Sequence, residues 1–113
     1  MKIAITSQNF RTITGHAGKT RRFLIHADDG NGRAMEVDRL DLPREMAMHE
    51  FRGTEHPLQQ VDVLITAGCG QGFVRRMAAW GIQVVATSES DPATAAQAVL
   101  DGRPLPPPEA HEH

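Results

Sequence analysis

Apolar and polar residues alternate with a period of two along three early segments of the chain. Residues 2–6, 20–27 and 33–40 each place apolar side chains on one face and polar ones on the other, a pattern typical of β-strands. The acidic and glycine-rich sequence of residues 28–32 joins the second and third segments and is typical of a hairpin turn. These segments therefore predict an antiparallel meander of three strands.

The second half of the chain changes to longer apolar runs separated by helical spacing. Residues 61–67 and 82–86 are almost wholly apolar, as expected of strands that are buried on both faces of a sheet. Apolar positions recur at helical spacing after residue 72, and Asp91 with Pro92 is a strong helix start before Gly102. Because crossover helices join parallel strands, the predicted class is α/β with a mixed five-stranded sheet, in which strand 2 is antiparallel.

Two regions have no clear periodicity. Residues 42–56 are expected to be mostly loop, followed by a helical turn over 57–60. Residues 103–113 hold four prolines and are expected to be a disordered tail. The chain is thus predicted to be a single domain over residues 1–102, with the element order βββ(α)βαβα.

Composition limits the possible functions. The 113 residues include one cysteine, Cys69, which excludes a disulfide framework, a four-cysteine zinc site and a cluster held by four cysteines of one chain. No apolar run approaches the roughly 20 residues of a membrane span, and the N-terminus lacks a signal peptide, so a cytoplasmic protein is expected. The net charge is −2, yet residues 1–27 carry five cations and no acid, which indicates an anionic ligand; neither a nucleic acid nor a membrane is expected as a partner.

Two glycine-bearing loops resemble nucleotide motifs without matching them. Residues 15–20 end in Gly-Lys-Thr, but a strand instead of a helix is predicted to follow, so a P-loop is excluded. Residues 68–72 read Gly-x-Gly-x-Gly between a strand and a helix, but Phe73 stands where a dinucleotide fingerprint needs glycine. Such a turn still presents backbone N–H groups and the positive end of a helix to an anion.

Cys69 and His16 are the candidate ligands in these loops. A thiol at a helix N-terminus favours the thiolate, and Arg75 and Arg76 lie close enough in sequence to reinforce it. The alternative is that Cys69 is a small buried residue and His16 an ordinary loop histidine. If the first and fourth strands are neighbours, both loops leave the same edge of the sheet. His49 and His56 are more simply loop histidines, as are His111 and His113 in the tail.

Several segments in this order resemble the dinitrogenase iron–molybdenum cofactor biosynthesis family, which comprises small cluster carriers and the C-terminal domain of a cofactor-assembly radical enzyme. The resemblance covers residues 1 to about 102. It rests on the initial strand, His16-Ala17-Gly18, His56-Pro57-Leu58, the run from Val61 to Gly72, Gly81-Ile82, and Thr87-x-x-x-Asp91-Pro92.

The resemblance implies a three-layer α/β/α fold with a ribonuclease H-like motif and transient binding of an iron–sulfur cofactor precursor without turnover. The family's loop histidine falls on His16. Ala17 stands where the family more often has phenylalanine, and Cys69 where it commonly has an aliphatic residue or methionine. The first strand lacks the acids of a ribonuclease H-like nuclease, and one cysteine is too few for the radical enzyme.

The leading hypothesis is a non-enzymatic carrier for an iron–sulfur or iron–molybdenum-type cluster in cofactor assembly, related to nitrogen fixation. Its expected partners are cluster-donor and cluster-acceptor proteins, and it would act as a monomer or as a homodimer that shares a cluster. His16 and Cys69 are the candidate metal ligands. The remaining candidate cofactor-binding residues are Gly18, Lys19, Arg21, Gly68, Gly70, Gln71, Gly72, Arg75 and Arg76.

Two alternatives remain open. A small regulatory module could bind a phosphorylated metabolite or nucleotide at Gly68–Gly72. A thiol-dependent enzyme would need a base for Cys69, for which His16 is the candidate, but no third orienting residue is evident.

Overall fold

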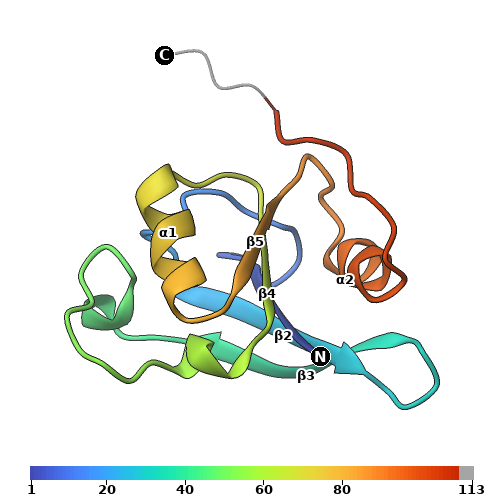
Figure 1. Ribbon diagram of the computed structural model, residues 1–113, viewed down its shortest axis with the longest axis horizontal. Helices are drawn as coiled ribbons and strands as arrows, with labels where there is room; N and C mark the ends of the chain where they lie inside the picture. The colour runs from blue at the N-terminus through green and yellow to red at the C-terminus, as the bar shows by residue number, and fades with distance from the viewer. Residues whose placement is uncertain (110–113) are drawn as a thin grey trace.

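The computed structural model describes residues 1–109 and contains one mixed sheet with a helix on each side (Figure 1). The strands and helices follow the predicted order. They are β1 (Lys2–Thr6), β2 (Arg22–Asp28), β3 (Ala34–Asp41), the short 3-10 helices η1 (Arg44–Met46) and η2 (Pro57–Gln60), β4 (Val63–Thr66), α1 (Gln71–Ala79), β5 (Gln83–Ala86) and α2 (Pro92–Leu100).

The five strands lie in the order β3-β2-β1-β4-β5. β1 pairs antiparallel with β2, and β2 with β3, whereas β1–β4 and β4–β5 are parallel pairs. The α/β class and the antiparallel second strand are therefore confirmed, and the strand order is consistent with a ribonuclease H-like motif. β1 and β4 are paired in parallel, with Ile3 opposite Val63, so the loops that follow these two strands leave the same end of the sheet.

Alternating side chains send two apolar clusters to opposite faces of the sheet. On one face, Ala4 and Leu64 pack with Phe73 and Met77 of α1 and with the segment that follows β3. On the other face, Ile3, Ile5 and Ile65 pack with Ala95 and Ala96 of α2. Because every residue of β4 is buried, this central strand agrees with the prediction from its apolar run.

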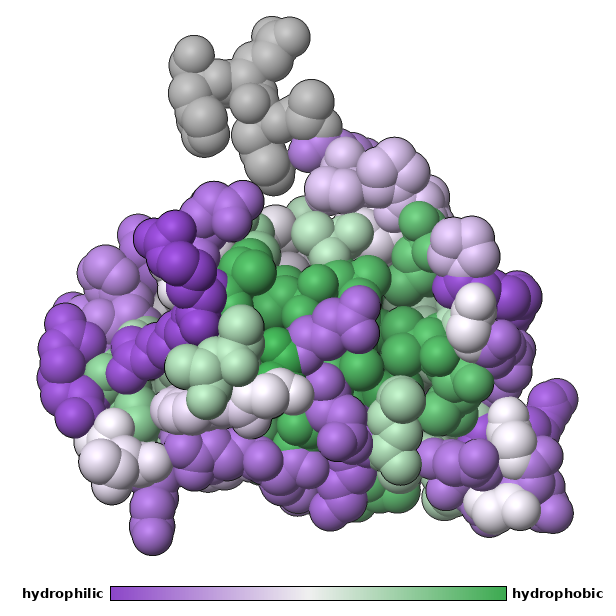
Figure 2. Space-filling view, viewed as in Figure 1, coloured by the Kyte–Doolittle hydropathy of each residue, from purple (hydrophilic) through white to green (hydrophobic). Residues whose placement is uncertain are grey.

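The two edge strands differ from the expectation. β5 was predicted to be fully buried, but Gln83 is exposed and the three residues after it are only partly buried, because β5 has a neighbour on one side only. In Figure 2 the face that carries β5 is apolar at its centre, between α1 and α2, and polar around its margin. At the other edge, Met35 and Val37 of β3 remain about half exposed beside a β-bulge.

The irregular segment between β3 and β4 is ordered by contacts with α1. His56 caps η2: its Nδ1 accepts a hydrogen bond from the N–H of Leu58 at 3.0 Å, while its Nε2 donates to the carbonyl of Met46 at 2.7 Å. The ring stacks on Trp80 and meets the edge of Phe51. The predicted turn over residues 57–60 is confirmed, and the role of His56 is structural.

Residues 103–109 follow α2 back toward the end of β5. The hydroxyl of Thr87 donates to the carbonyl of Pro106 at 2.6 Å, and the N–H of Ser88 donates to the carbonyl of Pro107 at 3.1 Å. The boundary near residue 102 stays a prediction, and the part of the tail beyond residue 109, with His111 and His113, lies outside the described residues. Within residues 1–109 no helix is long and apolar enough to cross a membrane.

Candidate functional site

A cavity of about 700 Å³ opens at the end of the sheet where β1, β4 and β5 finish. Its walls come from three loops, which follow these three strands, together with the segment after η1 and the end of the segment after α2. The lining residues are Ile13, Gly15, His16, Ala17, Gly18, Lys19, His49, Ala67, Gly68, Cys69, Gly70, Thr87, Ser88, Glu89, Ser90 and Glu109. This volume is within the range of small-molecule and cofactor sites.

Backbone hydrogen bonds hold the first two loops against each other. The N–H of Ala67 donates to the carbonyl of Thr14 at 3.1 Å, and the N–H of Ala17 donates to the carbonyl of Gly68 at 3.2 Å. A Cβ on Gly15 would stand only 3.6 Å from the nitrogen of Gly68. The loops that carry His16 and Cys69 are thus neighbours, as the pairing of β1 with β4 requires.

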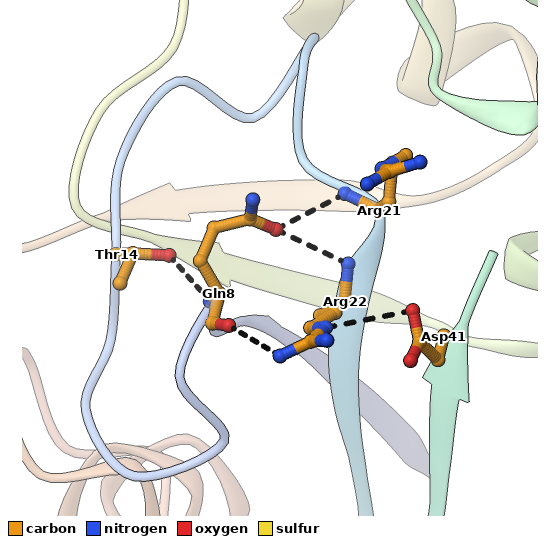
Figure 3. A network of polar contacts seen from close by, with 5 residues as sticks. All are labelled: Gln8, Thr14, Arg21, Arg22 and Asp41. Atoms are coloured by element: carbon orange, nitrogen blue, oxygen red, sulfur yellow. Dashed lines mark hydrogen bonds and ion pairs between the residues drawn. The ribbon is translucent and has the colours of Figure 1, made fainter. Parts of the chain in front are cut away.

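The start of the first loop is fixed by Gln8 (Figure 3). Its side-chain oxygen accepts hydrogen bonds from the N–H groups of Arg21 and Arg22, and its own N–H donates to the Thr14 hydroxyl at 3.0 Å. The Arg22 guanidinium donates to the Gln8 carbonyl and lies 3.5 Å from the Asp41 carboxylate. This network closes residues 8–22 into a loop whose conformation is set by its own polar groups.

His16 has a left-handed backbone and an exposed side chain. Its φ of 54° is unusual for a residue with a side chain. Its carbonyl accepts hydrogen bonds from the N–H groups of Lys19 and Thr20, which hold the turn in place. Residues kept in such a conformation are concentrated at functional sites, so the geometry supports the selection of His16 as a candidate ligand.

Cys69 departs from the expectation of a stabilised thiolate. The side chain is half-buried and packs against the core cluster beneath α1. This burial raises the pKa of the Cys69 thiol above its ordinary value. The uncharged thiol is therefore favoured at neutral pH, in contrast to the thiolate that a helix start alone would favour.

The charges around the cavity are divided between its two sides. Lys19 lies on one wall, and Glu89 and Glu109 lie on another. The Glu89 carboxylate accepts hydrogen bonds from the N–H groups of Ser90 and Asp91, at 2.9 and 3.0 Å, so its charge is partly neutralised locally. Helix α1 begins after Gly70, at the cavity wall, and its positive end adds to the field of Lys19.

The structure brings together six of the predicted binding residues at the cavity. They are His16, Gly18, Lys19, Gly68, Cys69 and Gly70. Arg21, Gln71, Gly72, Arg75 and Arg76 are not among the lining residues. Arg76 instead donates hydrogen bonds to the carbonyls of Met48 and Phe51, because its position on α1 faces the segment between β3 and β4.

Sequence reasoning missed the loop after β5 and the contribution of His49. Thr87, Ser88, Glu89 and Ser90 line the cavity because β5 ends beside β4. Ligands bind at the carboxyl ends of parallel strands, and β5 is also a parallel strand, so this rule could have predicted that the loop after β5 lines the cavity. His49 had no such signal, since a tertiary hydrogen bond from its N–H to the carbonyl of Gly18, at 2.7 Å, places it there.

The cavity does not contain a complete metal site made by this chain alone. Within residues 1–109, no three histidine, cysteine, aspartate or glutamate side chains are grouped so that they could bind one metal ion. His16, Cys69 and His49 nevertheless face the same cavity from different segments. Thiolate and imidazole are both ligands that iron takes in proteins.

Comparisons with known proteins agree with the fold and with the resemblance noted in the sequence. The family described as dinitrogenase iron-molybdenum cofactor matches residues 1–102. The crystal structure of PH0822 superimposes with a TM-score of 0.65 at 18% identity, over 91% of this chain and 92% of that one. An NMR structure of a NifB-like protein from Thermotoga (TM1290), of the DUF35 family, gives a TM-score of 0.56 at 18% identity, over 99% and 97%. Among curated proteins no relative matches.

Proposed function

Because this chain belongs to the dinitrogenase iron-molybdenum cofactor family, which is linked to the biosynthesis of that cofactor, we propose that it is a non-enzymatic carrier of an iron–sulfur or iron–molybdenum-type cluster. The cluster is its cargo, bound in the cavity at the ends of β1, β4 and β5. In this role the protein receives the cluster from a donor protein, keeps it from solvent and releases it to an acceptor protein in the cytoplasm.

The observation that carries the proposal is that His16 and Cys69 line one cavity. The two residues are far apart in sequence, and the parallel pairing of β1 with β4 brings their loops together. Iron in such clusters is bound by thiolate and, in some centres, by imidazole. An exposed imidazole and a half-buried thiol on neighbouring loops therefore form a two-residue ligand set for one cluster.

A small ligand set suits transfer. Two protein ligands leave other iron positions open to a donor protein, an acceptor protein or a second copy of this chain. Lys19 and the positive end of α1 attract the negative charge of the cluster without forming bonds to its metal ions. The cargo is thereby held by charge and by few coordinate bonds, so that release does not require the protein to unfold.

Binding of the cluster to Cys69 involves the release of a proton. Since burial raises the pKa of its thiol, the group is protonated before the cluster arrives. Binding of iron to the sulfur then displaces the proton, as metal binding to a thiol requires. Cluster affinity at Cys69 is accordingly expected to increase with pH.

Anaerobic reconstitution tests the proposal. The protein is incubated with ferrous iron and sulfide, or with purified cofactor, and the charge-transfer absorbance and metal content are measured. His16→Ala and Cys69→Ser should each weaken the chromophore. The matched control is Arg33→Ala in the β2–β3 hairpin, at the opposite end of the sheet, and should leave it unchanged. A colourless protein under all of these conditions would contradict a carrier role.

Lys19 and the start of α1 at the cavity wall also suit a second candidate function, in which Cys69 does not bind metal. The cavity would then serve a regulatory module for a phosphorylated metabolite or nucleotide, held by the backbone of the Gly68–Gly72 turn, of which residues 68–70 line the cavity. Thermal denaturation with a panel of nucleotides and phosphosugars separates the two functions. Stabilisation by one of these ligands, unchanged in Cys69→Ser, supports the module, while stabilisation by the cluster alone supports the carrier.

A further inference from the structure

A second hollow adjoins the cavity and is rich in positive charge. This groove, of about 690 Å³, is lined by Lys19, Arg21, Arg44, Ala47, His49 and Glu50. Two of these residues, Lys19 and His49, also line the cavity described above. The groove is thus a neighbour of the cavity and shares Lys19 with it, and it adds two cationic side chains of its own, Arg21 from the first loop and Arg44 from η1.

The cations of the groove are not neutralised by nearby acids. The ion pairs within residues 1–109 are Arg22–Asp41, Arg39–Glu36 and Arg103–Asp101, so Lys19, Arg21 and Arg44 have no carboxylate within 4.0 Å in that part of the chain. Glu50 is the single acid in the lining. Three permanent cations face one acid in a concave surface, where a positive potential is focused.

Backbone hydrogen bonds hold the two walls of the groove together. The N–H of His49 donates to the carbonyl of Gly18 at 2.7 Å, and the N–H of Leu42 donates to the carbonyl of Arg21 at 2.9 Å. Residues 18–21 and 42–49 are therefore attached at both ends of the groove. The backbone that carries the cations is thus held before any ligand arrives, so that binding needs to order only the side chains, which lowers its cost.

We propose that this groove is a binding site for the oxyanion group of a small molecule, a phosphate or a carboxylate. Guanidinium groups match the geometry of both anions with paired N–H donors, and the groove presents two of them, Arg21 and Arg44, together with the Lys19 ammonium. The site is separate from the cluster ligands His16 and Cys69, which do not line it. It accounts for Arg21, a predicted anion-binding residue that lies outside the cavity.

The test uses the metal-free protein, so that its outcome does not depend on the carrier role. Inorganic phosphate and succinate are titrated separately, at constant ionic strength, and backbone amide chemical shifts are recorded by NMR. Saturable shifts confined to residues 18–21 and 44–50 are expected. The anion that saturates at lower concentration identifies phosphate or carboxylate as the preferred group.

Variants test which side chains bind the anion. Arg21→Gln with Arg44→Gln should weaken binding by at least about tenfold, the effect of losing charge-assisted hydrogen bonds worth about 1.4 kcal/mol. Arg33→Gln, in the β2–β3 hairpin, is the matched control and should leave the affinity unchanged. Shifts that do not saturate, that spread over the whole protein, or that persist in the double variant would overturn the site. Cluster reconstitution can succeed or fail independently of this result.

Discussion

The Arg76 guanidinium donates a hydrogen bond of 2.5 Å to the carbonyl oxygen of Phe51 and lies 5.7 Å from the centre of the same residue's ring. A second hydrogen bond, also 2.5 Å, joins it to the carbonyl of Met48. Through these contacts α1 holds the segment that places His49 at the wall of the cavity. Arg76 therefore acts on the site through the backbone of residues 48–51 and does not meet a ligand itself.

Replacement of Arg76 by methionine should destabilise the protein by about 2 kcal/mol, because two carbonyls lose a charged hydrogen-bond donor while most of the packing remains. Arg76→Lys should not restore the loss, since a single ammonium cannot reproduce the paired geometry of a guanidinium. Urea unfolding measures both values. Arg75→Met, at an exposed position of the same helix, is the control and should change stability by less than about 0.5 kcal/mol. Equal losses for Arg75 and Arg76 would contradict this role.

Stability should fall when the pH is lowered below about 6.5, the ordinary pKa of histidine. Burial lowers the pKa of both His56 and His26. For His56 this effect exceeds the opposite effect of the Met46 carbonyl. For His26 it exceeds the opposite effect of the acids Glu36 and Asp91. The folded protein then binds fewer protons than the unfolded chain between the lowered pKa and 6.5, so the free energy of unfolding decreases as pH falls through that window. The Nδ1 of His56 would also lose its role as an acceptor.

Urea unfolding between about pH 7.5 and 5 measures this effect. His56→Asn keeps a side-chain acceptor for the η2 cap but removes the titrating ring, so the pH dependence should become shallower. Leu58→Ala in the same turn is the control, because it destabilises the protein without removing a titrating group. A pH dependence that is unchanged in His56→Asn would show that His56 does not contribute to it.

His16→Gly should separate stability from binding. Glycine adopts a positive φ without the strain of a side chain, so the free energy of unfolding should stay equal or rise by up to about 1 kcal/mol. Cluster binding should nevertheless be weakened, because the imidazole is absent. His16→Ala should weaken binding as well, without the gain in stability. If His16→Gly still binds the cluster with the affinity of the unmodified chain, His16 is not a ligand.

Cys69 should react slowly with iodoacetamide at neutral pH. Because its pKa is raised, the alkylation rate should increase only in the alkaline range, above the point where the same thiol reacts in the urea-unfolded chain. Mass spectrometry follows the reaction without interference, since Cys69 is the single cysteine of the chain. A rate that is already at its plateau near neutral pH would show an activated thiolate and would support the hypothesis of a thiol-dependent enzyme.

The strands and helices were predictable because their side-chain periodicity is local. β1 and β2 form where alternation predicts strands, although both are interior strands and are buried on both faces, and β4 is as fully buried as its apolar run indicated. The hairpin after β2 follows from Asp28, whose carboxylate accepts hydrogen bonds from the N–H groups of Gly30 and Gly32. The exposure of β5 and of Met35 could not be read in this way, because it depends on which strands lie at the edges of the sheet.

The candidate site was predictable in part. Connectivity alone indicated that the loops of His16 and Cys69 leave one edge, and the cavity contains both residues. Of the two interpretations of Cys69, the burial of the thiol favours the small buried residue over the stabilised thiolate, because the sequence shows a helix start but not the packing of the thiol against the core. The hydrogen bonds of Arg76 could not be predicted from the sequence either, since its partners Met48 and Phe51 lie 28 and 25 residues away.

The sequence by itself determined the order of elements, the fold class and the two loops that meet at the cavity, because turn residues and hydrophobic periodicity act over a few neighbouring positions. Only the tertiary structure decided which charges face which hollow. It directs Arg76 to backbone carbonyls, places Arg21 with Arg44 in the groove, and raises the pKa of the Cys69 thiol through burial. Electrostatics depend on distance and desolvation in three dimensions, and neither quantity is encoded in the spacing of residues along the chain.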